Sequence, residues 1–371
     1  MEQGVLQIVI MNKKLVLFVS GLHGGGAEGV CVKIANQLAF KGYDIDLLVL
    51  NFNDKKRLSE VSSKVNLINL GVSSVKLSLP SLRKYIKGRK PQIFITFSHE
   101  LSVACIVARK ILGKRYNFSV ISRNINFLSK SVFASNHIVY GYLYRWLLMR
   151  VYIHSDYFIA QSIAMKDDMV QILNIPNKKV RVINNPCSKV KLNNYRNQQV
   201  KEVICIGRLE KQKRFDRAII SFYFYHKTNP DIKMTIYGEG RLKQELINLV
   251  HKLDLQDSVS FLGFVNDLCK VYRPGAITLL SSDYEGFPNV LVESISYGIP
   301  VVSVDCTSGP SEIIENNVNG FLSHKTNIVA LVEILRLGVL KNWDVLEVKQ
   351  SSERFSIERI AHEYEEVISD F

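Results

Sequence analysis

Two successive series of short apolar runs, alternating with helix-length amphipathic segments, run along this chain. Such alternation predicts parallel sheets with helices on both faces, because parallel strands need long crossover connections. A polar, turn-rich stretch at 184–199 separates the two series. The sequence therefore predicts an α/β protein with two doubly wound, Rossmann-like domains. The expected strands lie at 15–20, 45–50, 93–97, 118–122 and 157–160 in the first series, and at 203–206, 234–237, 259–261, 277–280 and 301–304 in the second.

The length of 371 residues agrees with two domain cores, since a domain averages roughly 150 residues. Ligands of doubly wound sheets bind at the carboxyl ends of the strands, which predicts a substrate site in a cleft between the domains. Met11 resembles a natural start, so we interpret residues 1–10 as an extension outside the fold. We expect an N-terminal domain at 1–184, a linker at 185–200, a C-terminal domain at 201–355, and a helix at 356–371 that can return to the N-terminal domain.

Positive charge is concentrated in the first half of the chain. Residues 1–190 hold 27 Lys and Arg against 10 Asp and Glu, whereas the remaining residues hold 21 against 24. This asymmetry predicts that the N-terminal domain faces a polyanion. No nucleic-acid module is recognisable, so we expect no nucleic acid and favour an anionic membrane or lipid-linked substrate. The basic, amphipathic segment 76–90 predicts either a packing helix with a solvated basic face or a helix that docks on an anionic leaflet.

Cysteine, histidine and hydropathy patterns exclude several classes of site. The six cysteines are scattered, with no two within four positions, which fits a reducing cytosol rather than a disulfide framework. No metal-ligand spacing occurs, so we expect no metal cofactor. No apolar run reaches the length of about 18 residues that a transmembrane helix needs, and the first residues lack signal-peptide features. We therefore expect a cytoplasmic protein.

Glu285 and Glu293 lie eight positions apart, across an expected strand-to-helix loop. The run at 277–280 predicts a buried strand, and 289–297 predicts a helix that ends before Gly298. Glu285 then falls on the loop, and Glu293 falls within the helix. Unpaired N–H groups and the helix dipole between the two carboxylates favour a phosphate. A phosphate flanked by two hydroxyl-binding carboxylates is typical of a sugar-nucleotide site.

Two further loops carry residues suited to a diphosphate. Arg208 and Lys213 follow the first strand of the second series, where Arg suits bidentate phosphate contact and Lys adds a point charge. A glycine-rich loop after the first strand also matches the G-x-G-x-x-G pattern of nicotinamide- and flavin-binding enzymes. That pattern expects an acidic residue at the end of the second strand, where this chain has Asn51. The loop fits better as a backbone approach to a donor diphosphate, and its glycines are Gly24, Gly25 and Gly26.

In order and spacing, these motifs resemble the retaining family 4 glycosyltransferases, whose GT-B fold has two Rossmann-like domains facing a central cleft. The likeness extends along the whole chain and is strongest from 206 to 322. It implies that Glu285 holds the donor-sugar hydroxyls, that Glu293 holds the ribose diol, and that Arg208 and Lys213 stabilise the leaving diphosphate. The catalytic residues it implies are Glu285, Arg208 and Lys213. The other donor contacts it implies are Gly24, Gly25, Gly26, Gly238, Phe264, Gly286, Phe287, Asn289, Val290, Leu291 and Glu293.

The chain departs from the family pattern at two places. The family usually has arginine after the glutamate of the glycine loop, where this chain has Gly29. The family also usually has a cleft histidine in the N-terminal domain, and the corresponding stretch 121–124 lacks one. His99 follows a strand end, where a helix-start role and a cleft role are both open.

The resemblance implies transfer of a hexose or N-acetylhexosamine from a nucleotide-sugar donor, most simply a UDP-linked one. The acceptor it implies is a glycan or a polyprenyl-diphosphate-linked glycan of a bacterial O-antigen, capsule or related lipopolysaccharide-type pathway. It implies no metal ion and a peripheral position on the inner face of the plasma membrane. Two alternatives stay open. A GT-B sugar-nucleotide epimerase would need further acid/base carboxylates, and a non-catalytic basic binding protein would need no glutamate pair.

Overall fold

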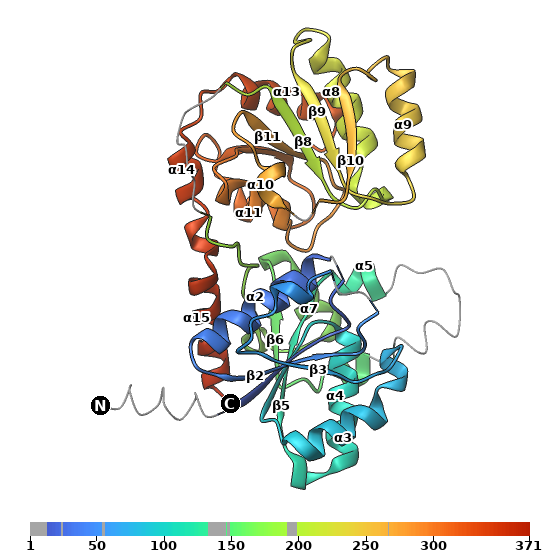
Figure 1. Cartoon of the computed structure of the whole chain (residues 1–371), viewed down its shortest axis with the longest axis vertical. Helices are drawn as coiled ribbons and strands as arrows, with labels where there is room; N and C mark the ends of the chain where they lie inside the picture. The colour runs from blue at the N-terminus through green and yellow to red at the C-terminus, as the bar shows by residue number, and fades with distance from the viewer. Residues whose placement is uncertain are drawn as a thin grey trace. The chain divides into compact units, whose positions relative to one another are not determined.

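The computed structural model describes residues 13–23, 25–53, 56–132, 146, 149–190, 199–265 and 267–371. These residues form two compact units (Figure 1). Unit 1 comprises the described residues up to Pro186 together with Ile357–Phe371, and unit 2 comprises Cys187–Ser356. Gly24, residues 1–10 and the stretch 191–198 of the expected linker lie outside the described residues. Each unit has its own parallel sheet, which confirms the predicted pair of Rossmann-like domains.

Among the described residues, unit 1 has a seven-stranded sheet of order β3-β2-β1-β4-β5-β6-β7, with every pairing parallel. Alternate residues of β1 enter different cores. Leu15 and Leu17 pack on one face, whereas Val16 and Phe18 pack on the other. A strand covered on both faces needs this continuous apolar run. The strands are β1 (Lys14–Val19), β2 (Asp44–Val49), β3 (Asn66–Asn69), β4 (Ile93–Thr96), β5 (Ser119–Arg123), β6 (Tyr157–Ala160) and β7 (Val180–Val182).

The last helix of the chain, α15 (Ile357–Ser369), packs on α2 (Gly26–Phe40) in unit 1. Ile360 and Tyr364 of α15 enter the same core as the buried face of α2. Lys41, at the end of α2, pairs with Glu365. Within the described residues, the other α-helices of unit 1 are α3 (Leu79–Arg89), α4 (His99–Leu112), α5 (Leu128–Val132) and α7 (Ile163–Leu173).

Unit 2 has, among its described residues, a six-stranded parallel sheet of order β10-β9-β8-β11-β12-β13. Val203 and Cys205 of β8 enter the larger core, and Ile204 between them enters a smaller cluster with Tyr237 and Tyr272. The strands are β8 (Glu202–Ile206), β9 (Lys233–Tyr237), β10 (Val259–Gly263), β11 (Ala276–Leu280), β12 (Val301–Val304) and β13 (Gly320–Ser323).

Helices α8 and α13 pack against each other over the larger core of unit 2. Asn327 caps α13 by accepting a hydrogen bond from Ala330 N at 2.8 Å, which satisfies one of the N–H groups left unpaired at a helix start. The α-helices of this unit are α8 (Phe215–His226), α9 (Lys243–Lys252), α10 (Leu268–Val271), α11 (Asn289–Ser296), α12 (Pro310–Ile313), α13 (Ile328–Leu340) and α14 (Val345–Gln350).

The strand order reverses beside the first strand of each unit. In unit 1, β1 lies between β2 and β4, and in unit 2, β8 lies between β9 and β11. Connections that leave such neighbouring strands diverge, and ligands of doubly wound sheets bind at this point of reversal, beyond the carboxyl ends. In unit 2 the loops at that point are 207–214 and 281–288. Both contain residues that the sequence predicts to contact the donor.

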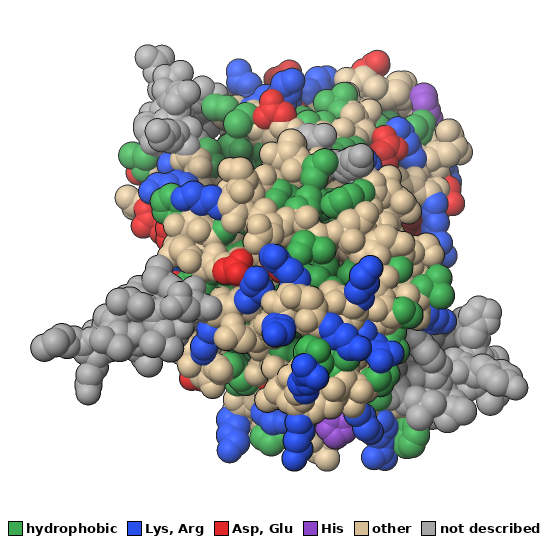
Figure 2. Space-filling model, turned by 60° about the horizontal axis from the view of Figure 1, so that its bottom comes forward, with side chains coloured by type: hydrophobic (Ala, Val, Ile, Leu, Met, Phe, Trp, Pro, Cys, Tyr) green, Lys and Arg blue, Asp and Glu red, His purple; other side chains and the backbone are tan. Residues whose placement is uncertain are grey.

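A basic face covers the α3 end of unit 1, and Figure 2 shows Lys and Arg side chains gathered there. The apolar residues of α3 do not contribute to that face, since Leu82, Tyr85 and Ile86 are buried. This observation agrees with the packing-helix interpretation of 76–90. The exposed lysines of α3, α4 and the residues just after each helix are Lys84, Lys87, Lys90, Lys110 and Lys114.

Candidate active site

Several hydrogen bonds join the loops that follow β8 and β11. Asp283 N donates to Gln212 O at 2.9 Å, and the Gln212 side chain donates to Tyr284 O at 2.8 Å. Ser281 Oγ donates to Lys213 O at 3.1 Å. One loop is therefore fixed against the other, and side chains from the two loops meet at defined separations.

Glu285 is the buried carboxylate of these loops, with 6% of its surface exposed. Lys213 Nζ donates to Glu285 Oε1 at 2.6 Å, and Ser282 Oγ donates to the same oxygen at 2.6 Å. No described residue donates a hydrogen bond to Glu285 Oε2. The carboxylate is therefore held through one oxygen, and the other has no hydrogen-bond donor among the described residues.

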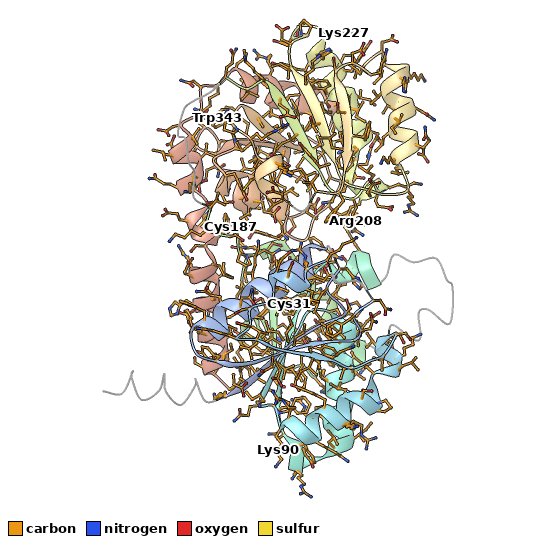
Figure 3. All side chains as sticks on the ribbon, in the orientation of Figure 1. Cys31, Lys90, Cys187, Arg208, Lys227 and Trp343 are labelled. Carbon is orange, nitrogen blue, oxygen red and sulfur yellow. The ribbon has the colours of Figure 1, made fainter. Side chains whose placement is uncertain are left out.

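Arg208 directly follows Gly207 at the carboxyl end of β8, and its side chain is exposed (Figure 3). Within the described parts of the chain, that side chain makes no hydrogen bond or ion pair. Lys213 differs, because its ammonium group is already paired with Glu285. Of the two cations that the sequence predicts for a diphosphate, Arg208 is the one that the protein leaves unpaired.

Gly207 and Gly238 allow the loops after β8 and β9 to touch. Gly238 has a φ of 135°, and a Cβ at this position would lie 1.9 Å from Gly207 O. No other residue type fits there without moving the backbone. Gly238 thus acts through its backbone, and it brings a second loop against the one that carries Arg208.

The start of α11 follows Glu285 after three residues. Pro288, at the N-cap position, provides no side-chain cap, so the first turn lacks the usual hydroxyl or carboxylate acceptor for its N–H groups. Phe287 and Leu291 have side chains buried in the core, with 6% and 0% of their surfaces exposed. Any contact of these two residues with a donor is therefore a main-chain contact.

A third loop supports this helix start. Ser308 Oγ donates to Gly286 O at 3.0 Å, and Ser308 has a φ of 114°, which is rare for a residue other than glycine. The next residue, Gly309, lies so close to Pro288 that a Cβ would be 2.3 Å from Pro288 Cδ. The loop after β12 therefore packs tightly against the segment that links Glu285 to α11.

Glu293 lies on α11 beside Tyr272. The Tyr272 hydroxyl donates to Val290 O at 3.2 Å and approaches Glu293 Oε2 at 3.5 Å. Burial raises the pKa of Tyr272 well above its usual value, and the neighbouring Glu293 carboxylate raises it further. The hydroxyl therefore stays protonated, and its single proton lies between the nearer Val290 carbonyl and the Glu293 carboxylate.

An open pocket of about 470 Å³ lies beside the ends of β9 and β10. Two of its lining residues, Tyr237 and Val265, pack in one cluster with Tyr272, whose hydroxyl approaches Glu293. Phe264, which the sequence predicts near a base, is 48% exposed next to this pocket wall. The pocket is lined by Tyr237, Leu262, Val265, Lys270 and Arg273.

In unit 1, the glycine loop leads into α2. Gly25 is the N-cap residue of α2 and has extended backbone angles, with φ −73° and ψ 162°. A Cβ on Gly25 would lie 2.3 Å from Glu28 Oε2, so the carboxylate folds back over this glycine. Gly26 begins the helix.

The buried carboxylate of β2 is bound entirely by the protein. Asp46 is fully buried, with its Oδ1 bound by Arg89 Nη2 at 2.6 Å. Its Oδ2 accepts hydrogen bonds from Arg89 Nε at 3.0 Å and from the Tyr85 hydroxyl at 2.6 Å. A nicotinamide-binding fold needs a free carboxylate at the end of this strand for the ribose diol, and Asp46 has both oxygens occupied.

His99 is the first residue of α4, and Ser98 caps that helix by accepting from Leu101 N at 3.3 Å. Burial lowers the pKa of His99, and Glu100 opposes this shift only in part. The structure agrees with the helix-start interpretation. In the stretch that lacks the family histidine, Arg123 is 1% exposed and lies over the Phe97 ring at 5.0 Å.

Among the described residues, no group of three or more His, Cys, Asp and Glu side chains is placed to hold a metal ion. Within the same residues, we find no helix that is both long enough and apolar enough to cross a membrane.

Models of two glycosyltransferase families match consecutive parts of the chain. The model described as Glycosyltransferase Family 4 matches residues 24–188, and the model described as Glycosyl transferases group 1 matches residues 191–354. This chain is a family 4 glycosyltransferase. The predicted family membership is confirmed.

Several relatives of this glycosyltransferase are similar over nearly their whole length. An uncharacterized glycosyltransferase of Haemophilus influenzae is 26% identical, with 96% of this chain and 100% of the relative covered. An alpha-1,4-N-acetyl-D-galactosaminyltransferase of Campylobacter jejuni, named for a GalNAc-containing diNAcBac-PP-undecaprenol, is 27% identical, with 96% and 98% covered. The crystal structure of HepE from Anabaena with UDP-glucose is 19% identical, has a TM-score of 0.76 and covers 96% and 100%. This likeness confirms the predicted GT-B fold.

The glycosyltransferase carries a guanidinium over Gly29 that the sequence analysis missed. A Cβ on Gly29 would lie 2.8 Å from Arg57 Cζ and Nη1. Arg57 pairs with Glu60 at 2.9 Å, and its backbone N donates to Leu22 O at 3.2 Å. The space beside residue 29, where the family usually has arginine, is thus filled by an arginine from the loop after β2. The glycine at 29 was the one sequence signal that pointed to such a neighbour.

Proposed function

We propose that this glycosyltransferase moves a hexose or N-acetylhexosamine, with retention of anomeric configuration, from a UDP-linked donor to a lipid-linked glycan. The observation that carries the proposal is the carboxylate of Glu285. It is buried at the strand reversal of unit 2, is held by Lys213 through Oε1 and has Oε2 open. A donor sugar presents several hydroxyl groups, and an ionised carboxylate oxygen is a strong acceptor for them.

The donor diphosphate lies, in this proposal, between Arg208 and the start of α11. Arg208 is an exposed cation with no partner among the described residues, and the first turn of α11 has no side-chain cap. Both features favour an anion. As the bond to the sugar breaks, negative charge grows on the diphosphate, and fixed positive groups lower the barrier by stabilising it.

Lys213, although paired with Glu285, also contributes to stabilising the charge of the diphosphate. Its ammonium group is paired with Glu285, and it retains further N–H donors that can reach an incoming phosphate. With these groups present, we propose that no divalent ion takes part in the reaction. A saturating chelator should leave turnover within about twofold of the untreated enzyme. Loss of activity with chelator and recovery with manganese or magnesium would contradict this part of the proposal.

The nucleoside is assigned to Glu293 and the pocket beside β9 and β10. Tyr272 lies beside Glu293 and packs with Tyr237 and Val265, which line that pocket. The Glu293 carboxylate suits a ribose diol, and the apolar side chains of the pocket suit a flat base. The proposed order of groups along the site is base, ribose, diphosphate and sugar, ending at Glu285.

The acceptor is proposed from the relatives and from charge. The names of two Campylobacter jejuni relatives include undecaprenol linked through a diphosphate. The basic face of α3 and α4 suits the surface of an anionic leaflet in which such a lipid lies, at about 1 kcal/mol for each Lys or Arg near the surface. Because the apolar side of α3 is buried, this docking would be electrostatic, at the inner face of the plasma membrane.

Sedimentation with vesicles tests the docking. The wild-type protein should bind vesicles that contain anionic lipid at low salt and should dissociate at high salt. A variant with Lys84, Lys87 and Lys90 changed to Glu should bind less and lose activity on lipid acceptor, while UDP binding is retained. A wild-type protein that ignores anionic vesicles would rule out this mode of membrane association.

The decisive experiment is a donor panel. The purified enzyme is incubated with UDP-hexoses, UDP-N-acetylhexosamines and the corresponding GDP and dTDP sugars, each with and without a polyprenyl-diphosphate-linked glycan. Release of UDP that depends on the acceptor, with a product of retained configuration by NMR, supports the proposal. Conversion of the donor to its epimer without acceptor would instead identify a sugar-nucleotide epimerase. Absence of any turnover across the panel would remove the proposed donor class.

A further inference from the structure

Ser282 lies at the beginning of the loop after β11 and is completely buried. Its hydroxyl donates to Glu285 Oε1 at 2.6 Å. The same oxygen accepts the Lys213 ammonium, also at 2.6 Å. Two donors from different loops therefore converge on one of the two carboxylate oxygens.

This convergence determines which oxygen a ligand meets. A carboxylate oxygen has two lone-pair positions for hydrogen bonds, and Ser282 and Lys213 fill both at Oε1. We propose that Ser282 is a positioning residue for the donor sugar, which together with Lys213 fixes the Glu285 carboxylate so that Oε2 alone faces the sugar hydroxyls. The inference rests on the proposed role of Glu285.

The lysine alone would not fix the carboxylate in this way. Lys213 reaches Glu285 through four methylene groups, and a single point charge attracts either oxygen equally well. Ser282 is a short side chain on a rigid backbone, because the residues on both sides of it, Ser281 and Asp283, are bonded to the loop that carries Lys213. The hydroxyl therefore selects one oxygen and sets the plane of the carboxylate.

Fixing the orientation of a carboxylate contributes most to the reaction rate when the group that it binds is the group that reacts. A carboxylate that rotates must lose that freedom each time the donor binds, whereas a carboxylate held in place meets the sugar without that cost. The serine need not contact substrate for this effect, since it acts through Glu285.

The test begins with Ser282→Ala, which removes the hydroxyl and little volume. We expect kcat/KM for the donor to fall roughly 10- to 100-fold, the range for one hydrogen bond to a charged group. Ser282→Thr keeps the hydroxyl and should recover most of that loss. Ser221→Ala is the matched control, because Ser221 is equally buried in unit 2 and bonds only within helix α8, to Arg217 O. It should leave kcat/KM unchanged.

A double-mutant cycle with Glu285→Gln tests whether Ser282 acts through Glu285. This test holds even if the buried site cannot accommodate the extra methyl group of Ser282→Thr. If Ser282 acts through Glu285, the double variant should be no slower than Glu285→Gln alone, within about twofold. Losses that multiply would show that Ser282 acts elsewhere and would overturn the inference. Wild-type kcat/KM in Ser282→Ala, with Glu285→Gln inactive, would overturn it while the proposed function stands. Full activity in Glu285→Gln would instead remove the proposed function itself. Melting temperatures of all variants identify any loss that comes from unfolding.

Discussion

Each unit of this glycosyltransferase contains a buried carboxylate with a cation and a hydroxyl beside it, and the two differ in which oxygens are used. Asp46 in unit 1 accepts hydrogen bonds at both oxygens, from Arg89 and Tyr85. Glu285 in unit 2 accepts both of its hydrogen bonds at Oε1. Both oxygens of the first carboxylate are bound by the protein, whereas the second carboxylate has one oxygen without a donor among the described residues.

The difference sets Asp46, whose partners all come from the protein, apart from Glu285, for which we propose a role in donor binding. Burying a charge is costly unless the protein replaces its water contacts. Asp46 meets that requirement completely, and burial, which would raise its pKa, is outweighed by the hydrogen bonds from Arg89 and Tyr85, which lower it. Glu285 meets the requirement only in part, which is the arrangement expected where a substrate completes the set of partners.

The largest predicted effect is on the open carboxylate. Glu285→Gln keeps the shape of the side chain but replaces the charged acceptor with an amide. We expect kcat to fall about 10²- to 10³-fold, the range for loss of one preorganised electrostatic contact. Steady-state UDP release measures this change. A variant with turnover close to wild type would mean that the open oxygen of Glu285 does not face the donor.

The complementary change is Asp46→Asn, which should affect stability rather than turnover. It removes the charge that Arg89 and Tyr85 stabilise, and we expect about 1–3 kcal/mol less free energy of unfolding at neutral pH, since Arg89 is itself 40% exposed. The activity of the folded variant should stay near wild type. Urea unfolding, followed by circular dichroism, measures the difference.

The stability contribution of the Asp46 carboxylate should depend on pH in a definite direction. The pKa of Asp46 is held below its usual value in the folded state, so its contribution is present above the unfolded pKa of about 4 and is lost as the pH falls through the lower, folded value. The stability gap between wild type and Asp46→Asn should therefore shrink in acid. A gap that stays constant from pH 7 to pH 3 would show that the charge of Asp46 is not the stabilising feature.

The strands that sequence analysis predicted are mostly central strands buried on both faces; the exception is β10, an edge strand of mixed burial that was predicted at 259–261. The run at 277–280 corresponds to β11, and 301–304 corresponds to β12. The strands it missed are β3, β7 and β13, which lie at edges of their sheets and are only partly buried. An edge strand has one paired side and a mixed surface, so it lacks the continuous apolar run that identifies a central strand.

The same limit applies to the site. The sequence predicted Glu285 and Lys213 as members of one site, but the bond between them joins residues 72 apart and exists because β8 and β11 are neighbours. Ser282 has no distinctive spacing, and its role depends on where its hydroxyl points. Arg57 was missed for a similar reason, since its guanidinium reaches Gly29 from a different loop. Local patterns identify residue types, and the sheet order decides which of them meet.

The same comparison applies to cations. Arg208 has no partner within the described residues, unlike Arg89, so Arg208→Ala should leave the melting temperature unchanged and lower kcat/KM for the donor about tenfold. Lys227→Ala removes an exposed cation at the other end of unit 2, as Figure 3 shows, and should change neither quantity. An equal effect of both variants on kcat/KM would point to the general charge of the unit instead of a phosphate contact.

The smallest predicted effect concerns Arg57 of unit 1, the arginine that is paired with Glu60. Arg57 is held by Glu60 and lies against Gly29, so a methyl group at 29 must displace the guanidinium. Gly29→Ala raises helix propensity by about 1 kcal/mol, yet we expect it to be neutral or destabilising while Arg57 is present. In an Arg57→Ala background the same change should be stabilising, because the space is then empty.

A coupling of about 1 kcal/mol or more between the two substitutions, measured by urea unfolding, would establish the contact. Additive effects would mean that Arg57 does not occupy the place beside residue 29. Because Arg57 is paired with Glu60 and not with a group of the proposed site, turnover per folded molecule should change with neither substitution. A specific loss of turnover in Arg57→Ala would instead indicate a functional role for this arginine.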